Sequence, residues 1–275
     1  MKKILVPTDF SETANNAFVH ALGLAKVVDA ELILLHTYEL PLIDNQFEVQ
    51  NYEVLIASLE GSNTKKFKEE IAKLKAIATA NNYEEIQISQ LLVSGELINS
   101  INEVLKTEKI DFVVMGTSGA TGWKEAFLGT NTGEAIVNLS VPVLSIPKEC
   151  KYANIETIGF TTRYREKDKI ALRQVIEIAK SAGASVKCLY VKNTEDDGTD
   201  ATIKEWNELF KNEPITFFIL PNEEVSQTIA DFIIHQEIDV LAMLTYKRSF
   251  FASLFTSSLT EKMSYNSEVP ILALH

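Results

Sequence analysis

The sequence lacks the features that would place it outside ordinary globular proteins. Only two of its 275 residues are cysteines, Cys150 and Cys188, and they form no metal-ligand or redox spacing. No apolar run approaches the roughly 20 residues that a membrane-spanning helix needs. The apolar part of the opening MKKILVP is also too short for a signal peptide. We therefore expect a reduced, cytoplasmic protein that is not inserted in a membrane.

Basic residues are also in deficit. Lysine and arginine number 26 against 38 aspartates and glutamates, which gives a formal net charge of −12. Binding to a nucleic-acid backbone or to an anionic membrane surface requires a basic face, so neither is expected as a partner. Hydrophobic residues make up 46% and charged residues 23%, a composition typical of a packed core.

Glycines are few, and they are unevenly placed. Five of the eleven lie between Val113 and Pro147: Gly116, Gly119, Gly122, Gly129 and Gly133. An apolar run at 112–115 leads into this stretch, and a helix-like segment at 131–139 falls within it. A strand, a glycine-rich loop and a helix start together bring backbone N–H groups close to a phosphate. We interpret the stretch as a nucleotide-binding loop.

The first half of the chain alternates strand and helix patterns. Buried-type strands are expected at 3–6, 31–38, 86–93, 112–115 and 141–146, and helices at 11–28, 63–81 and 96–108. Residues 39–61 are expected to form a loop with a short helix. The alternation indicates an α/β fold with a doubly wound parallel sheet. Ligands of such sheets bind beyond the carboxyl ends of the strands, where Pro7-Thr8-Asp9 and the glycine loop would meet if their strands are neighbours.

The second half of the chain repeats the first. A shift of 154 places Ala17, Ala25 and Leu35 on Ala171, Ala179 and Leu189, and a shift of 128 places Asp111, Met115 and Pro142 on Asp239, Met243 and Pro270. The shift falls from 154 to 128, which means that 26 residues are missing from the second copy, between its second and third strands. We predict two tandem domains, 1–148 and 152–275.

The second copy has not kept the glycine loop. Leu244 stands at the place of Gly116, Lys247 at that of Gly119 and Arg163 at that of Asp9. Leucine and lysine cannot supply the positive φ or the close backbone approach of glycine. The second domain is therefore expected to be a degenerate copy, with the nucleotide site in the first domain alone.

The spacing Gly116-x2-Gly119-x9-Gly129-Thr130 and the opening KILVPTDFS resemble the ATP-binding class of universal stress proteins. The resemblance covers both halves and implies a tandem universal stress protein. It implies two Rossmann-like domains, each a five-stranded parallel sheet of order 3-2-1-4-5. It also implies pairing of the fifth strands in an internal pseudo-dimer, with a homodimer as a further option. The implied ligand is ATP or a related adenine nucleotide, together with Mg²⁺, and the implied role is that of a stress-response sensor or regulator.

The resemblance also implies a set of binding residues, with no catalytic residue and no metal ligand among them. They are Pro7, Thr8, Asp9, Thr37, Met115, Gly116, Ser118, Gly119, Gly129, Thr130, Asn131 and Thr132. Asn131 stands three residues before Glu134, which is independently a helix N-cap signature. The family commonly has an aliphatic residue where this chain has Thr37, and a contact through the backbone would tolerate the difference.

Several alternatives stay open at this stage. Asp9 could cap the following helix instead of binding a ligand, and Lys124 and Glu125 could reach phosphates or be solvated. Arg163, Lys247 and Arg248 could form an anion pocket or be surface charges. A slow ATPase at the same site and a nucleotide-independent scaffold are the rival functions. The absence of a G-x-x-x-x-G-K-[ST] loop weighs against the ATPase.

Overall fold

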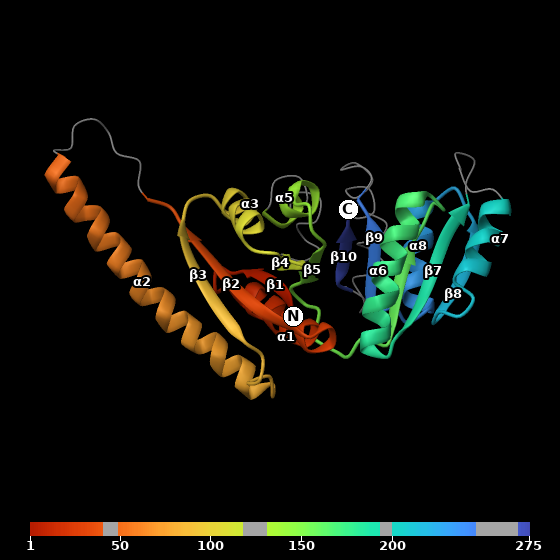
Figure 1. The fold of residues 1–275 in the computed structure, drawn as a ribbon, viewed down its shortest axis with the longest axis horizontal. Helices are drawn as coiled ribbons and strands as arrows, with labels where there is room; N and C mark the ends of the chain where they lie inside the picture. Colours follow the sequence, from red (N-terminus) through yellow and green to blue (C-terminus); the bar gives the residue numbers. More distant parts are fainter. Residues whose placement is uncertain (41–48, 118–130, 193–199, 246–268) are drawn as a thin grey trace.

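A computed structural model describes residues 1–40, 49–117, 131–192, 200–245 and 269–275. Ten strands form one sheet in the order β3-β2-β1-β4-β5-β10-β9-β6-β7-β8. Figure 1 shows the two halves side by side, with β5 and β10 meeting at the centre of the sheet. No helix in these ranges is long and apolar enough to cross a bilayer.

The first half has the predicted strand order 3-2-1-4-5, with all its strands parallel. Its elements are β1 (Lys2–Pro7), α1 (Glu12–Val28), β2 (Ala30–Tyr38), α2 (Val49–Ala80), β3 (Ile88–Ser94), α3 (Leu97–Thr107), β4 (Phe112–Thr117), α5 (Asn131–Asn138) and β5 (Val143–Pro147).

The second half repeats this order as β8-β7-β6-β9-β10. Its elements are β6 (Thr157–Thr161), α6 (Glu166–Ala182), β7 (Ser185–Lys192), α7 (Asp200–Leu209), β8 (Ile215–Pro221), α8 (Val225–His235), β9 (Val240–Leu244) and β10 (Ile271–Leu274).

The strand register confirms the two sequence shifts. Ile4 of β1 pairs with Phe112 of β4. In the second half Ile158 pairs with Val240, residues that lie 154 and 128 positions further along. The two halves therefore share the alignment of their central strands as well as their strand order.

The shortening of the second half falls where the sequence predicted it. From the second to the third strand the chain advances 56 residues between Leu32 and Ile88, but only 29 between their counterparts Val186 and Ile215. The second copy is therefore 27 residues shorter at this point. It regains one residue before its fourth strand, which leaves the net difference of 26.

The two halves join through their fifth strands, as the resemblance implied. β5 and β10 pair antiparallel, with Leu144 opposite Leu272. The buried hydroxyl of Ser145 donates to the carbonyl of Ile271 at 3.3 Å. This is the single antiparallel step among the described strand pairs, and it makes one continuous sheet of the two halves.

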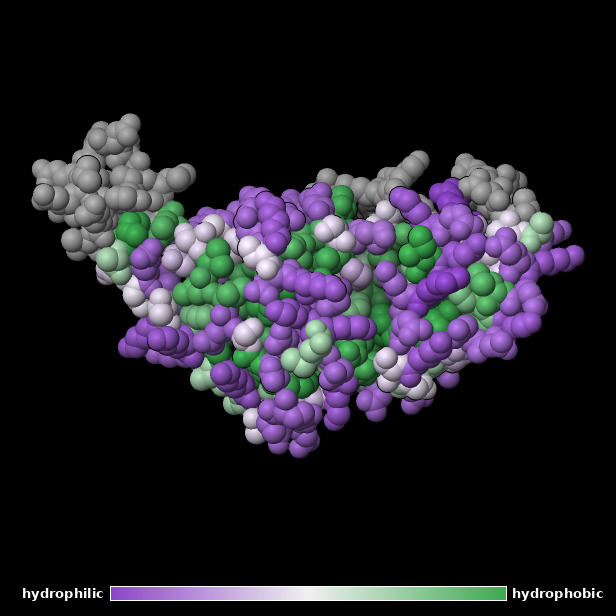
Figure 2. All heavy atoms as spheres, in the orientation of Figure 1, coloured by the Kyte–Doolittle hydropathy of each residue, from purple (hydrophilic) through white to green (hydrophobic). Residues whose placement is uncertain are grey.

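Apolar residues cover both faces of the sheet. Ile4 and Val6 pack on one face with α1, α2, α6 and α7, and Leu5 packs on the other with α3, α5 and α8. Because successive residues of a strand point to opposite faces, a strand buried on both sides is apolar throughout. Figure 2 shows hydrophilic side chains over much of the outer surface, with hydrophobic side chains between them on both halves.

The prediction for residues 39–61 was wrong from residue 49 onward. α2 is one helix of 32 residues that begins at Val49, not at Asn63. Over residues 56–80, whose burial the structure describes, the buried residues Phe67, Ile71, Leu74 and Ala78 all lie in the C-terminal part. None of residues 56–66 is buried, and Figure 1 shows the N-terminal part of α2 running past the sheet. Val49, Tyr52, Ile56 and Leu59 stand three or four residues apart, which is helical spacing, so the sequence held a signal for this start that the loop prediction did not use.

Candidate functional site

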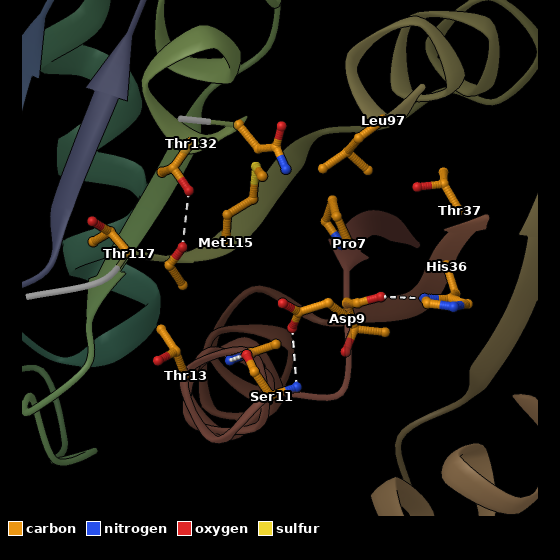
Figure 3. A pocket seen from close by; sticks show the side chains of 14 residues that line it. Pro7, Asp9, Ser11, Thr13, His36, Thr37, Leu97, Met115, Thr117 and Thr132 are labelled. Carbon is orange, nitrogen blue, oxygen red and sulfur yellow. Dashed lines mark hydrogen bonds between the residues drawn. The ribbon is translucent and has the colours of Figure 1, made fainter. Parts of the chain in front are cut away.

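A cavity of about 580 Å³ lies in the first half at the carboxyl ends of β1, β2 and β4. Figure 3 shows its lining side chains converging from the loop after β1, the first turn of α1, the end of β2 and the start of α5. The fourteen lining residues are Pro7, Thr8, Asp9, Ser11, Thr13, Ala14, His36, Thr37, Leu97, Met115, Gly116, Thr117, Asn131 and Thr132. β1 and β4 are neighbours in the sheet, so the crevice forms at the point where strand order reverses, as the sequence predicted.

The loop after β1 is fixed by its own hydrogen bonds. The Thr8 N–H donates to the Leu35 carbonyl at 2.8 Å, and the buried Thr8 hydroxyl accepts from the Phe10 N–H at 3.0 Å. Phe10 has a φ of 63°, a left-handed conformation that is rare for a bulky residue and that needs support from its surroundings. The loop is therefore preorganised around Asp9.

Asp9 is exposed and lines the cavity. One carboxylate oxygen accepts from the Ser11 N–H at 3.0 Å, while its other oxygen has no protein partner among the described residues. The helix cap itself is Ser11, whose hydroxyl accepts from the Ala14 N–H at 3.2 Å. Asp9 thus orders the loop before the helix, and one of its oxygens faces no protein donor among the described residues.

The end of β2 contributes His36 and Thr37. Nδ1 of His36 lies 2.7 Å from the Thr8 carbonyl. Its ring contacts Phe10 at a centroid distance of 4.7 Å and stacks on Phe67 of α2 at 6.1 Å. This half-buried histidine has a partner for its Nδ1 and packs against two aromatic rings.

The end of β4 meets the start of α5. The Thr132 hydroxyl, which is buried, donates to the Gly116 carbonyl at 2.8 Å. Met115 is buried, and Asn131 is exposed at the first position of α5. The first N–H groups of a helix have no partner within it and carry its positive end, so this corner of the cavity suits an anion.

Of the two reasons for glycine at position 116, a positive φ and a close backbone approach, the structure supports the second. Gly116 has no positive φ, so conformational freedom is not what requires glycine there. A Cβ at this position would lie 2.7 Å from both Cγ2 and the carbonyl oxygen of Thr13 in α1. Glycine is needed because β4 and α1 approach one another closely, a contact between elements that the sequence does not reveal.

Eight of the twelve predicted binding residues come together in this cavity. They are Pro7, Thr8, Asp9, Thr37, Met115, Gly116, Asn131 and Thr132. Ser118, Gly119, Gly129 and Thr130 lie outside the described residues, as do Lys124, Glu125, Lys247 and Arg248.

Comparison with known proteins decides the family. The model of the universal stress protein family matches residues 1–147, which is more than half of the chain. The chain belongs to the universal stress protein family.

Two relatives come from Methanocaldococcus jannaschii. Universal stress protein MJ0577 is 28% identical over an alignment of 159 residues that covers 54% of this chain and 96% of that protein. Universal stress protein MJ0531 is 31% identical over 151 residues, 54% of this chain and 84% of that protein.

A solved structure shares the fold over both halves. The crystal structure of a universal stress protein from Archaeoglobus fulgidus aligns with a TM-score of 0.67, over 99% of this chain and 95% of that one. At 16% identity this similarity concerns the fold alone. This similarity and the repeated strand order show that this universal stress protein consists of two halves with the same fold, one after the other in the chain.

Six residues that line the cavity of this universal stress protein were not predicted as binding residues. They are Ser11, Thr13, Ala14, His36, Leu97 and Thr117. Ser11, Thr13 and Ala14 belong to the cap and first turn of the helix after Asp9, so the predicted N-terminus of that helix was a signal for them. Leu97 is the first residue of α3. No sequence signal pointed to it, because it reaches the cavity only through the packing of α3 on the sheet.

In the second half, the loop after β6 corresponds to the loop after β1, and a carboxylate of the second half binds its polar groups. Asp168, at the place of Ala14, is fully buried. One of its oxygens accepts from the Thr162 hydroxyl at 2.9 Å and from the N–H groups of Arg163 and Arg165 at 2.7 and 3.2 Å. Burial raises the pKa of Asp168, and these hydrogen bonds oppose the rise. Backbone donors of this loop are thus used within the protein.

Proposed function

We propose that the first half of this universal stress protein binds one adenine nucleotide, ATP with Mg²⁺, and that the chain serves the stress response as a nucleotide-dependent sensor or regulator. The observation that carries the proposal is the cavity between the ends of β1 and β4, where eight independently predicted residues meet. Its volume of about 580 Å³ falls within the roughly 300–1,000 Å³ of small-molecule sites.

The described residues fit the parts of such a nucleotide. The free oxygen of Asp9 would accept hydrogen bonds from the adenosine hydroxyls, beside the wall formed by Pro7 and Thr8. Thr37 would meet the base through its backbone. The start of α5 at Asn131 would hold phosphate oxygens, because helix N-termini favour negative charge. Ser118, Gly119, Gly129 and Thr130 complete the proposed set.

Mg²⁺ would come with the phosphates. Among the described residues no group of three or more histidine, cysteine, aspartate or glutamate side chains could hold a metal ion. Mg²⁺ usually keeps several waters and binds through substrate phosphates and one or two carboxylates. Asp9 is the carboxylate that lines the cavity, so the ion would depend on the nucleotide for most of its ligands.

We further propose domains at 1–148 and 152–275 and a cytoplasmic location, in which the two free thiols of Cys150 and Cys188 would stay reduced. The net charge of −12 supports the expectation that nucleic acid is not a partner. A homodimer stays a prediction, which light scattering on the purified chain would test.

Binding is tested by titrating the purified chain with ATP in the presence of Mg²⁺, after mass spectrometry of any ligand released on denaturation. We expect one ATP per chain. Asp9→Ala should weaken binding by about tenfold or more, because a hydrogen bond to a charged group contributes roughly 1.5–3 kcal/mol. Arg163→Ala changes the matching residue of the second half and should leave the affinity unaltered.

The proposal fails if the chain binds no adenine nucleotide, or if Asp9→Ala binds as well as the parent. Gly116→Leu is not a suitable test, since any side chain there disturbs α1. A phosphate-release assay separates a sensor from a slow ATPase: repeated turnover that Asp9→Ala abolishes would favour the enzyme.

A further inference from the structure

The strand β8 forms the edge of the sheet at the opposite end from β3 (Figure 1). On its inner side the Pro214 carbonyl accepts from the Val186 N–H of β7 at 2.7 Å. Further along, the Asn222 N–H donates to the Lys192 carbonyl at 3.1 Å. Because alternate residues of a strand turn their backbone groups to the same neighbour, the even-numbered residues of β8 face β7. The odd-numbered residues face outward, where no described strand lies.

The outward donors of β8 are the N–H groups of Phe217 and Ile219. The Ile215 N–H donates to the Glu213 carbonyl at 2.7 Å, and Pro221 has no N–H. The strand, ITFFILP, also has no charged residue. Charged side chains are a common means by which proteins keep an edge strand from pairing. The edge of β8 can therefore accept another strand.

Two apolar side chains of β8 are more exposed than their matches in the first half. Ile219 and Leu220 are 40% and 38% exposed. The residues at the same places in β3 are Leu92 and Val93. Both are half-buried and pack against the core, one on each face of the sheet. The end of β8 thus presents apolar surface that the described part of its own half does not cover.

We propose that β8 pairs antiparallel with β8 of a second copy of this chain about a two-fold axis, so that the sheet continues from one molecule into the next. The register that overlaps all seven residues of the strand places Phe217 opposite Ile219 of the second copy, with Phe218 opposite its own counterpart. The outward N–H groups then meet outward carbonyls. On the other face of the sheet, Leu220 lies opposite Thr216 of the second copy.

A second copy is the occupant that this edge favours. Two-fold pairing brings the same surface together from both chains, and no like charges meet across an uncharged strand. The two halves of the chain already join in this way, since β5 and β10 pair antiparallel with Leu144 opposite Leu272. The other edge strand, β3, exposes the polar residues Ser89 and Gln90. The pairing rests on the homodimer proposed above, gives it a surface, and does not depend on the nucleotide site.

Sedimentation velocity of the full chain over a wide range of concentrations tests the pairing. We expect monomer and dimer in exchange, with a dissociation constant on the order of 10 μM, because one strand pair is small for a specific interface. Ile219→Lys places a charge against the second strand and should weaken the dimer by about tenfold or more. Ile170→Lys is the matched control, because Ile170 lies on α6 and is 64% exposed, and it should leave the dissociation constant unchanged.

Two exposed positions test the register. Thr216 and Leu220 lie about 13 Å apart within one strand, but opposite one another across the proposed pair. Thr216→Lys and Leu220→Glu should each weaken the dimer by about threefold or more. The double variant should dimerise about threefold or more tightly than either single variant, because a lysine then faces a glutamate at both places. A double variant that associates no better than the single variants would refute this register.

The remaining outcomes separate the surface from the homodimer and from the nucleotide site. A chain that is monomeric at every concentration overturns the proposal, and the homodimer with it. A dimer that Ile219→Lys leaves unchanged keeps the homodimer but overturns this surface. Growth beyond two copies would also overturn it, because pairing of β8 with a different edge does not close. ATP titration of the same variants should match the parent, and a failure there concerns the nucleotide site alone.

Discussion

The ring of Tyr152 occupies the space that a side chain on Gly23 would need. Tyr152 belongs to the connection between the two halves, and Gly23 lies in the middle of α1. One and two turns earlier in α1, His20 contacts the Cys150 carbonyl at 3.2 Å and Asn16 donates to the same carbonyl at 2.8 Å. One face of α1 therefore contacts the connection between the halves, while the first turn of the same helix lines the cavity at the end of β1.

Gly23→Ala should disrupt the packing of Tyr152, and with it the segment that connects the two halves, against α1. The new methyl group would overlap the Tyr152 ring, so the ring or α1 must move, at a cost of about 1–3 kcal/mol in the free energy of unfolding. Urea denaturation measures the change. Gly61→Ala is the matched control, because Gly61 lies in a helix and a Cβ there meets nothing within 4 Å. It should stabilise the protein by about 0.5–1 kcal/mol. A loss of stability in both variants would count against the packing argument.

His20 should make this connection sensitive to acid. Burial lowers the pKa of His20 below its ordinary value of 6.5, and the bond to the Cys150 carbonyl opposes the shift only in part. The unfolded chain then takes up the proton first, so stability is present above pH 6.5 and is lost as pH falls through the lower pKa of the folded state. Melting temperatures between pH 7.5 and 5 should fall less in His20→Gln than in the parent. The exposed His235 provides the control, since His235→Gln should leave the profile unchanged.

Asp168→Ala should destabilise the second half, although alanine is what the first half has at this place. The substitution leaves the Thr162 hydroxyl and the Arg163 and Arg165 N–H groups without their acceptor. We expect a loss of roughly 3 kcal/mol in the free energy of unfolding, since each unsatisfied buried group costs about 1–3 kcal/mol. Glu166→Ala removes a neighbouring carboxylate that is 83% exposed and should cost no more than about 1 kcal/mol. Equal stabilities for the two variants would refute the role given to Asp168.

Gly116→Ala should lower stability before any ligand is considered. Its Cβ would lie 2.7 Å from Thr13 Cγ2 and from the Thr13 carbonyl oxygen, and we expect a loss of about 1–3 kcal/mol. Adding Thr13→Ser removes Cγ2 but not the backbone oxygen, so the double variant should recover only part of the loss. Full recovery would place the conflict in the side chain alone, and no loss at all would contradict the close approach of β4 and α1.

Local patterns predicted most of the fold. The strands of the first half appeared as apolar runs, and the helix predicted over 11–28 is α1, which begins at Glu12 after its cap Ser11. The repeat predicted the second half, down to the register of Ile158 on Val240. Such features depend on residues close together in the sequence or on comparison of the two copies.

The features that were not predicted depend on contacts between distant residues. Asn16 and His20 contact the carbonyl of Cys150, which lies more than 100 residues away in the sequence. A polar residue in a predicted helix gives no indication of which distant group it will bind. The cavity was predicted from strand ends, but the contact of Gly116 with Thr13 came only with the packing of β4 against α1.

The place of β10 has a consequence for synthesis. It comes last of the ten strands in the chain and yet lies in the middle of the sheet, against β5. β5 ends at Pro147, 124 residues before Ile271. The first half can complete its five strands on the ribosome while the edge of β5 has no partner, and an apolar open edge invites pairing with other chains. A pause in translation of the second half therefore prolongs the period in which the nascent chain is most prone to aggregate.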